Sequence, residues 1–197
     1  AVGLHAVSRS RIREGDVVVV NGAGAIGSFL VAGVVAAGAG VVVAIDIDRA
    51  RLDVAARLGA SHTVDATEHE PYEVVKELTD GALADVTIEA SGVPEGMTRV
   101  QGLTRRGGTI LLVGLPKAHV SFDAVDLILR EIDVATTVAH VCDENLPAAL
   151  DLLTTIDLAK LLVERVVPLD RAVDDALRPM AEGRTRGKVL VDPLGRT

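Results

Sequence analysis

Short apolar runs recur along the chain, and longer stretches of mixed polarity separate them. Buried parallel strands have this appearance because both of their faces are covered, and the mixed stretches are typical of connecting helices. The pattern predicts strands at residues 16–21, 41–46, 62–65, 85–89, 108–113 and 132–138, and helices at about 25–37, 49–58, 70–79, 95–104 and 123–130. These elements predict an α/β fold, a doubly wound Rossmann sheet of about six parallel strands in the order 3-2-1-4-5-6.

The rhythm of the elements changes after residue 141. We expect a helix at about 143–154, a strand at 163–167, a helix at 170–181 and a last strand at 187–192. These shorter elements form a C-terminal α/β return segment. No linker rich in Pro, Ser or Gly precedes them, so they are not assigned to an independent domain.

Residues 17–45 contain no charged side chain, and a hydropathy window would mark them as a membrane span. Glycines interrupt this stretch and β-branched runs form its ends, so a buried strand, a helix and a second strand explain it better. We therefore expect no membrane contact. The chain begins without Met and without a basic leader, which suggests a piece of a longer cytoplasmic protein.

Composition narrows the classes of partner. The chain has 197 residues and a net charge of −8, which argues against a nucleic-acid partner. Two Phe, one Tyr and no Trp leave almost no platform for stacking single-stranded bases. The lone cysteine, Cys142, excludes an internal disulfide framework and a multi-cysteine zinc site, and it fits a reducing cytoplasm.

The most specific pattern is a glycine-rich turn between the first strand and the first helix. Gly22, Gly24 and Gly27 have GxGxxG spacing, in which they permit the turn, leave room for a pyrophosphate and allow close helix packing. The helix start offers free N–H groups to phosphates. Asp46 ends the second strand nineteen positions after Gly27, where a carboxylate accepts hydrogen bonds from a ribose and repels a 2′-phosphate. The pattern predicts an NAD-binding site.

Further landmarks follow this turn in order along nearly the whole chain. They are Arg51-Leu52, Leu58-Gly59-Ala60, Leu78-Thr79-Asp80-Gly81, Ala84-Asp85-Val86, Glu89-Ala90-Ser91-Gly92, Gly107-Gly108, Val113-Gly114-Leu115-Pro116 and Gly187-Lys188-Val189-Leu190. With them the chain resembles the medium-chain, zinc-dependent alcohol dehydrogenases, and among these the polyol, butanediol and threonine dehydrogenase branch.

The resemblance implies that a catalytic domain, which holds zinc in that family, precedes this chain. Residues 14–141 would be the NAD-binding domain, and segments 1–13 and 142–197 would pack against the absent domain. In the intact enzyme a zinc-bound secondary alcohol would pass a hydride to NAD. No residue of this chain is expected to bind zinc or to be catalytic, so the chain alone would be inactive.

The resemblance also assigns residues around the cofactor. Arg51 would lie against the adenosine ribose, although an arginine nearby can also accommodate a 2′-phosphate. Backbone groups of Val113 and Leu115 would meet the nicotinamide carboxamide. The full set of expected cofactor-binding residues is Gly22, Gly24, Ala25, Ile26, Gly27, Asp46, Ile47, Arg51, Ala90, Ser91, Val113, Gly114 and Leu115.

Other polar residues receive structural interpretations. We interpret His5 as a hydrogen-bonded packing residue and Asp85 as a turn former. His140 and Cys142 would share one face of a strand with no third ligand nearby, so neither a metal site nor a nucleophile is predicted there.

Two alternatives to an NAD- and zinc-dependent dehydrogenase stay open. A zinc-independent quinone or enoyl reductase of the same superfamily would often prefer NADP and lack an acid at the end of strand two. A non-catalytic NAD-sensing domain would not need residues 142–197. A small alcohol is the expected substrate, and we expect a homo-oligomer through residues 131–138, because an open strand edge rich in Val and Thr invites pairing.

Overall fold

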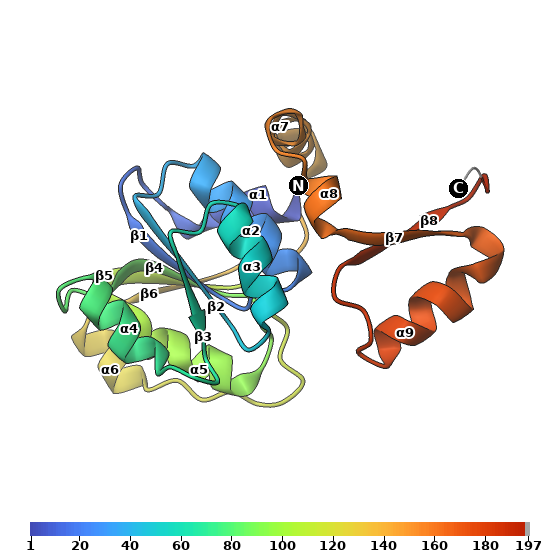
Figure 1. Ribbon diagram of the computed structural model, residues 1–197. Helices are drawn as coiled ribbons and strands as arrows, with labels where there is room; N and C mark the ends of the chain where they lie inside the picture. The colour runs from blue at the N-terminus through green and yellow to red at the C-terminus, as the bar shows by residue number, and fades with distance from the viewer. Residues whose placement is uncertain (196–197) are drawn as a thin grey trace. The chain divides into compact units, whose positions relative to one another are not determined.

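The computed structural model describes residues 1–195 and divides into two compact units, the first at Ala1–Leu152 and the second beginning at Leu153 (Figure 1). The first unit contains a six-stranded sheet and the second a two-stranded sheet. Each unit is described by itself.

The six-stranded sheet is parallel throughout and has the order β3-β2-β1-β4-β5-β6. Its strands are β1 (Val17–Asn21), β2 (Val41–Asp46), β3 (His62–Asp65), β4 (Ala84–Glu89), β5 (Thr104–Leu112) and β6 (Asp133–Thr136). The doubly wound fold and the strand order predicted from the sequence are therefore confirmed. The order reverses between β1 and β4, and ligands of such sheets bind at the carboxyl ends beside this point.

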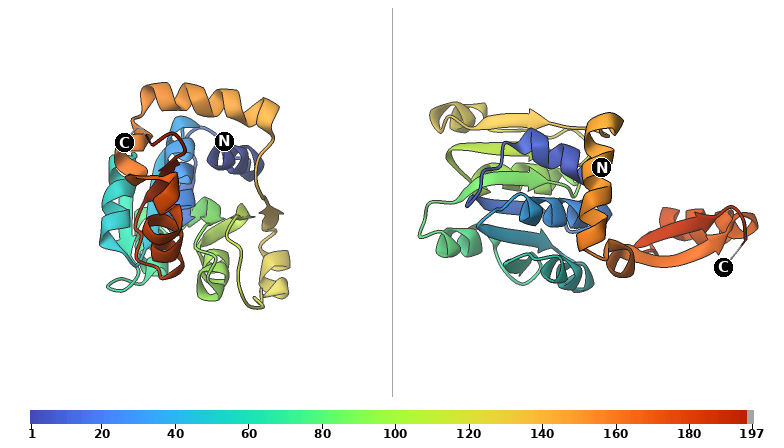
Figure 2. Two further views of the ribbon diagram at one scale, coloured as in Figure 1. Left: turned by 90° about the vertical axis from the view of Figure 1, so that its right-hand side faces the viewer. Right: turned by 90° about the horizontal axis from the view of Figure 1, so that it is seen from above.

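Helices cover both faces of the sheet (Figures 1 and 2). One face carries α1 (Val2–Ser10), α2 (Ala25–Ala36) and α3 (Arg49–Arg57), and the other carries α4 (Pro71–Leu78), α5 (Pro94–Leu103) and α6 (Ala124–Leu129). Because both faces are covered, the central strands are apolar along their whole length, and Val18, Val19 and Val20 are fully buried.

The apolar character of α2 follows from its position under α1. Its residues Leu30, Val31 and Val34 are fully buried. The two helices approach so closely that a Cβ on Gly3 would lie 2.9 Å from the backbone of Phe29. The uncharged stretch is thus β1, α2 and β2, as predicted, and within residues 1–195 no helix has the length and apolar character needed to cross a membrane.

Two strands of the six-stranded sheet differ from their predicted extents by more than one residue. β5 begins at Thr104 and not at residue 108, because Thr104 already pairs with Ala84 of β4. A bulge then shifts the register before Thr109 pairs with Val86. β6 runs from Asp133 to Thr136 and is three residues shorter than the predicted strand 132–138. The interpretation of Asp85 as a turn former is wrong, because this residue lies inside β4. Its carboxylate accepts hydrogen bonds from the Val17 N–H at 2.7 Å and from Arg105 Nε at 2.6 Å.

The C-terminal part has the predicted α/β character. α7 (Cys142–Thr155) is followed by the short α8 (Leu158–Leu162), which was not predicted, and β7 (Val163–Pro168) pairs in parallel with β8 (Lys188–Asp192). Between these strands the predicted single helix is a 3₁₀ turn, a π-helical segment and α9 (Arg178–Ala181). Packing of residues 1–13 and 142–197 against a further domain stays a prediction.

Candidate functional site

A tight turn connects the end of β1 with α2. Gly22 has a φ of +99°, a conformation that favours glycine, and its N–H donates to the Ile45 carbonyl oxygen at 2.8 Å. A Cβ on Gly22 would lie 2.5 Å from the Ser91 nitrogen, so the loop after β4 also requires a glycine here. A Cβ on Gly27 would overlap the Gly22 carbonyl oxygen. The closest contact of Gly27 is therefore with the turn, and Val20 of β1 follows at 3.8 Å.

The start of α2 is open toward solvent. Gly24 is the N-cap residue; among the described residues no side chain caps this helix, and its first turn carries no acidic residue. A Cβ on Gly24 would meet no described atom within 4 Å. The first N–H groups of a helix have no partner within it, and with the helix dipole they favour a bound anion. Ala25, Ile26 and Gly27 carry these groups.

The Asp46 carboxylate faces the glycine turn and is 8% exposed. Its Oδ2 accepts a hydrogen bond from the Ala23 N–H at 2.7 Å. Its Oδ1 accepts from the Ile47 N–H at 2.8 Å and from the Asp48 N–H at 3.0 Å. Three backbone groups thus fix the carboxylate between the end of β2 and the turn after β1.

A cleft of about 200 Å³ opens beside this carboxylate, and we call it the Asp46 cleft. It is lined by Asn21, Gly22, Gly24, Ile45, Asp46, Ile47, Arg51, Ala66, Ala90, Ser91, Val93 and Arg99. Arg51 is near two carboxylates, with its Nη1 3.6 Å from Asp46 Oδ1 and its Nε 3.9 Å from Asp48 Oδ2. Arg99 Nη1 lies 3.5 Å from Asn21 Oδ1. The cleft therefore combines one acid with two guanidinium groups.

The outer wall of this cleft is held by Asp65 at the end of β3. Hydrogen bonds from the Thr67 hydroxyl and the Thr67 N–H, at 2.6 and 2.9 Å, and the Arg49 guanidinium lower the pKa of Asp65 below its ordinary value. The next residue, Ala66, donates its N–H to the Asp46 carbonyl oxygen at 3.0 Å. The Asp65 carboxylate thus anchors the turn that places Ala66 in the cleft.

A fully buried carboxylate, Glu89, joins three strand ends. Its Oε1 accepts from the Ser91 N–H at 2.9 Å, from the Ser91 hydroxyl and from Asn21 Nδ2 at 3.3 Å. Its backbone carbonyl accepts from the Val113 and Gly114 N–H groups at 2.9 and 3.0 Å. Glu89 therefore connects the ends of β1, β4 and β5. Since the N–H groups of Val113 and Gly114 are occupied, other backbone groups would have to make the expected contacts to a carboxamide.

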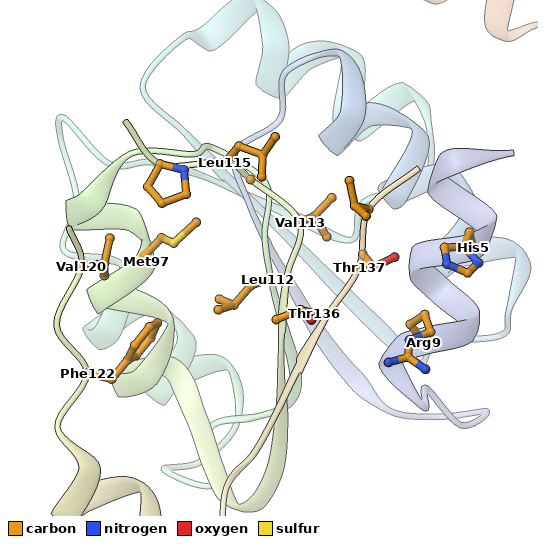
Figure 3. Close-up of a pocket in the computed structure, with 13 residues that line it drawn as sticks. His5, Arg9, Met97, Leu112, Val113, Leu115, Val120, Phe122, Thr136 and Thr137 are labelled. Atoms are coloured by element: carbon orange, nitrogen blue, oxygen red, sulfur yellow. The ribbon is translucent and has the colours of Figure 1, made fainter. Parts of the chain in front are cut away.

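A second cleft, of about 630 Å³, lies at the ends of β5 and β6, and we call it the Val113 cleft (Figure 3). It is lined by His5, Arg9, Met97, Leu112, Val113, Gly114, Leu115, Pro116, Val120, Phe122, Thr136, Thr137 and Val138. In Figure 3, Met97, Val120 and Phe122 lie on one side of the strand ends. His5 and Arg9 of α1 lie on the other side, and the Thr137 hydroxyl points toward them.

Three buried side-chain atoms of residues 1–195 lack a hydrogen-bond partner, namely His5 Nδ1, Arg51 Nε and Thr137 Oγ1. Arg51 lines the Asp46 cleft, and His5 and Thr137 line the Val113 cleft. Buried polar groups in proteins are nearly always paired, so these atoms mark places where a ligand, water or another domain supplies the partner. The sequence predicted His5 to be a hydrogen-bonded packing residue, and this prediction is wrong for its Nδ1 atom.

The expected site residues gather at the carboxyl edge of the sheet. Seven of them line the Asp46 cleft, namely Gly22, Gly24, Asp46, Ile47, Arg51, Ala90 and Ser91. Val113, Gly114 and Leu115 line the Val113 cleft, where the Leu115 side chain is 77% exposed. Ala25, Ile26 and Gly27 line neither cleft and lie at the start of α2. Cofactor contacts by these residues stay predictions.

Sequence reasoning missed several residues of both clefts. Glu89 belongs to one of the family landmarks, but no role was predicted for it. Its position at the end of an apolar strand could have indicated that its carboxylate is buried and hydrogen-bonded. Arg99 lies in α5 and Ala66 follows β3. The neighbours of both residues in the cleft are distant in sequence, so no local pattern indicated them. No local pattern indicated Thr137 either, because only the folded chain places it beside His5 and Arg9 of α1.

His140 and Cys142 do meet, but not through a strand. Cys142 opens α7, and its Sγ lies 3.4 Å from His140 Nε2, with both residues exposed. The expected strand alternation was therefore wrong. In the part of the chain that the structure describes, no three His, Cys, Asp or Glu side chains are grouped so that they could hold a metal ion.

A family model described as "Zinc-binding dehydrogenase" matches residues 25–155. The putative D-xylulose reductase of Rhizobium meliloti is 33% identical over 196 residues, which cover 98% of this chain and 55% of that protein. The sorbitol dehydrogenase of Gallus gallus is 33% identical over 178 residues, which cover 88% of this chain and 49% of that protein. The chain spans about half the length of these curated relatives.

Solved structures give the same relation. The 2R,3R-butanediol dehydrogenase from Bacillus subtilis matches with a TM-score of 0.89 at 27% identity, over 98% of this chain and 55% of that one. A putative zinc-binding dehydrogenase from Sinorhizobium meliloti, bound to NADP, matches with a TM-score of 0.84 at 26% identity, over 97% of this chain and 56% of that one. Both similarities extend over almost the whole of residues 1–197.

Proposed function

Since this chain belongs to the zinc-binding dehydrogenase family, we propose that it is the NAD-binding part of an alcohol or polyol dehydrogenase. The intact enzyme would transfer a hydride between a secondary alcohol and NAD. The observation that carries this proposal is the pairing of an open glycine turn with a carboxylate aimed at it. Asp46 Oδ2 lies 2.7 Å from the Ala23 nitrogen, and the space beside Gly24 is free.

The residues of both clefts fit a dinucleotide. The N–H groups at the start of α2 would hold the pyrophosphate, and the Asp46 carboxylate, which has acceptor capacity beyond its three N–H donors, would hold the ribose hydroxyls. The Val113 cleft would take the nicotinamide half, where His5 Nδ1 and Thr137 Oγ1 lack partners among the described residues. When bound, NAD supplies the acceptor carbon for the hydride. The chain binds and orients the cofactor and excludes water.

NAD is proposed over NADP because Asp46 is fixed in place. A 2′-phosphate would bring a second negative charge beside a carboxylate that three N–H groups prevent from turning away. Arg51 opposes this effect in part, since its guanidinium borders the same cleft. Because the similar structure from Sinorhizobium meliloti is bound to NADP, the preference of this chain for NAD over NADP should be measured.

Fluorescence titration of the chain with NADH and with NADPH tests the proposal. We expect NADH to bind at least tenfold more tightly, and Asp46→Asn to reduce this ratio because it removes the charge that repels the 2′-phosphate. Asp53→Asn, an exposed residue of α3, is the matched control. A chain that binds neither nucleotide would overturn the proposal.

The substrate and the zinc site belong to the rest of the proposed enzyme. We propose a small secondary alcohol or polyol as substrate, which is the class that the names of the relatives suggest. Zinc would be held by a further domain, so the chain alone should show no turnover of sorbitol or butanediol. Turnover by residues 1–197 alone would contradict the proposal that a further domain holds the zinc.

We also propose a cytoplasmic location.

A homo-oligomer through the β6 edge is part of the proposal. β6 is the last strand of the sheet, and Val134 within it and Val138 just after its end are exposed. Exposed apolar strand edges are places where a second chain adds to a sheet. Light scattering at micromolar concentration should give at least a dimer, and Val134→Lys should shift it toward the monomer. A monomer in both variants would contradict this interface.

The two alternatives are less favoured. A zinc-independent quinone or enoyl reductase would often prefer NADP, whereas Asp46 favours NAD. A non-catalytic NAD-sensing domain does not account for the similarity to dehydrogenases over residues 142–197, which the Rhizobium meliloti relative covers.

A further inference from the structure

The Asp46 cleft has an apolar slot that lacks an aromatic side chain. Ile45, Ile47, Ala66 and Val93 contribute apolar surface, and no Phe, Tyr or Trp occurs among the described residues that line it. A flat base usually stacks on an aromatic ring or on the plane of an arginine. In this cleft an arginine is therefore the side chain best suited to the role.

Arg51 is less suited to stacking than Arg99, because its guanidinium forms ion pairs with two carboxylates, although its Nε makes no hydrogen bond. Its Nη1 lies 3.6 Å from Asp46 Oδ1 and its Nε lies 3.9 Å from Asp48 Oδ2. Its guanidinium is thus directed toward the acid at the end of β2. Moving it over a base would separate these charges.

Arg99 is free of such restraints. It is half-buried, and no carboxylate of residues 1–195 forms an ion pair with it. Its one described hydrogen bond, from Nη1 to Asn21 Oδ1, is long at 3.5 Å. Asn21 in turn donates Nδ2 to the buried Glu89 at 3.3 Å, which fixes the amide against which Arg99 rests.

We propose that Arg99 is a cofactor-binding residue whose guanidinium plane stacks on the adenine ring in the Asp46 cleft. This assignment rests on the proposed function and adds to it a residue of α5 that no sequence motif indicated. The base lies between the apolar residues of the slot and the guanidinium, while Asp46 holds the adjoining ribose. Because guanidinium groups are weakly hydrated and planar, they stack on π systems at little cost in desolvation.

The assignment predicts a loss that is confined to adenine-containing ligands. Arg99→Ala should weaken the binding of NADH and of AMP by about tenfold and leave that of nicotinamide mononucleotide unchanged. Arg99→Lys keeps the charge but loses the plane, and should recover less than half of the binding free energy. Arg57→Ala, an exposed position of α3, removes the same charge and should bind all three ligands as the wild-type chain does.

Competition against NADH fluorescence measures these affinities in the full chain, with adenosine 2′,5′-bisphosphate as a further ligand. Thermal unfolding, monitored by circular dichroism, establishes that each variant is folded. If the wild-type chain binds neither NADH nor AMP, the proposed function itself fails. If it binds both and Arg99→Ala binds AMP equally well, only the Arg99 assignment is overturned. A loss confined to the bisphosphate would show a phosphate contact and would also overturn stacking.

Discussion

The Asp46 cleft and the Val113 cleft share one edge of the sheet but are built differently. The Asp46 cleft is formed largely by strand ends and their turns, and backbone N–H groups hold its carboxylate at 2.7–3.0 Å. The Val113 cleft is mainly apolar and draws on α1, α5 and the segments after β5 and β6. Two of its buried polar atoms, His5 Nδ1 and Thr137 Oγ1, have no hydrogen-bond partner among residues 1–195, whereas the Asp46 cleft has one such atom, Arg51 Nε.

The difference shows which part of the site the chain completes by itself. Groups that are already fixed lose little conformational freedom when a ligand binds, so the Asp46 cleft is preorganised. A buried atom without a partner costs free energy until a ligand, water or neighbouring domain satisfies it. The Asp46 cleft should therefore be sensitive to changes in its framework, and the Val113 cleft to changes in its unpaired groups.

The largest effect is expected from Gly27→Ala, which tests the rigidity of the Asp46 cleft. A Cβ at this position would overlap the Gly22 carbonyl oxygen, so either α2 or the turn has to move. We expect the free energy of unfolding to fall by about 3 kcal/mol and NADH binding to be lost. Urea unfolding and NADH titration measure the two effects.

Gly102→Ala is the matched control for this substitution. Gly102 lies in α5, its φ is not positive, and a Cβ there would meet no described atom within 4 Å. Alanine should stabilise this helix by about 0.5–1 kcal/mol and leave NADH binding unchanged. Equal stability of the two alanine variants would show that the turn is not rigid.

The same contrast explains what could be predicted from the sequence. The Asp46 cleft depends on a contiguous stretch, in which Gly22, Gly24 and Asp46 have spacing set by one strand, one helix and a second strand. The order of the strands also followed, because right-handed crossovers leave few topologies. Local patterns of the sequence were therefore sufficient to predict the fold and the residues at the centre of the Asp46 cleft.

The rest depends on contacts between distant segments. Thr137 and His5 line one cleft although 132 positions separate them, and neither belongs to a recognisable motif. The bulge at the start of β5 contains the Asp85–Arg105 pair and a left-handed Gly107, and no periodicity of the sequence reveals it. Such features are decided by packing, so only the folded chain displays them.

Glu89→Ala tests whether one residue supports both clefts. Its side chain accepts hydrogen bonds from Ser91, Gly92 and Asn21, and of these donors the Asn21 amide is buried and would lose this acceptor. We expect a loss of about 2–3 kcal/mol in unfolding free energy and weaker NADH binding. Glu89→Gln keeps one acceptor oxygen and should lose about half as much. If alanine and glutamine behave alike, hydrogen bonding to Glu89 is not what holds the strand ends.

Thr137→Val sharpens the comparison because its two expected effects have opposite signs. Removing a hydroxyl that lacks a partner should raise the free energy of unfolding by about 0.5–1 kcal/mol, since valine has a similar shape. The same change should weaken NADH binding if the cofactor supplies the missing partner. Thr137→Ser retains the hydroxyl and should bind NADH as the wild-type chain does. A destabilised valine variant would show that the hydroxyl is already satisfied, for example by water.

The smallest effect concerns Asp65, which supports the outer wall of the Asp46 cleft through Ala66. Thr67 and then Arg49 hold the pKa of the Asp65 carboxyl below its ordinary value, so the ionised form stabilises the folded chain. This stabilisation is fully present above the pKa of the unfolded chain, about 3.9, and is lost as the pH falls through the lower pKa of the folded chain. Asp65→Asn should therefore lower the urea midpoint at pH 7, and the difference from the wild-type chain should shrink steadily below pH 4. Asp53→Asn, on the exposed side of α3, should show no such pH dependence. A difference for Asp65→Asn that stays constant down to pH 3 would mean that shape, and not charge, holds the wall of the cleft.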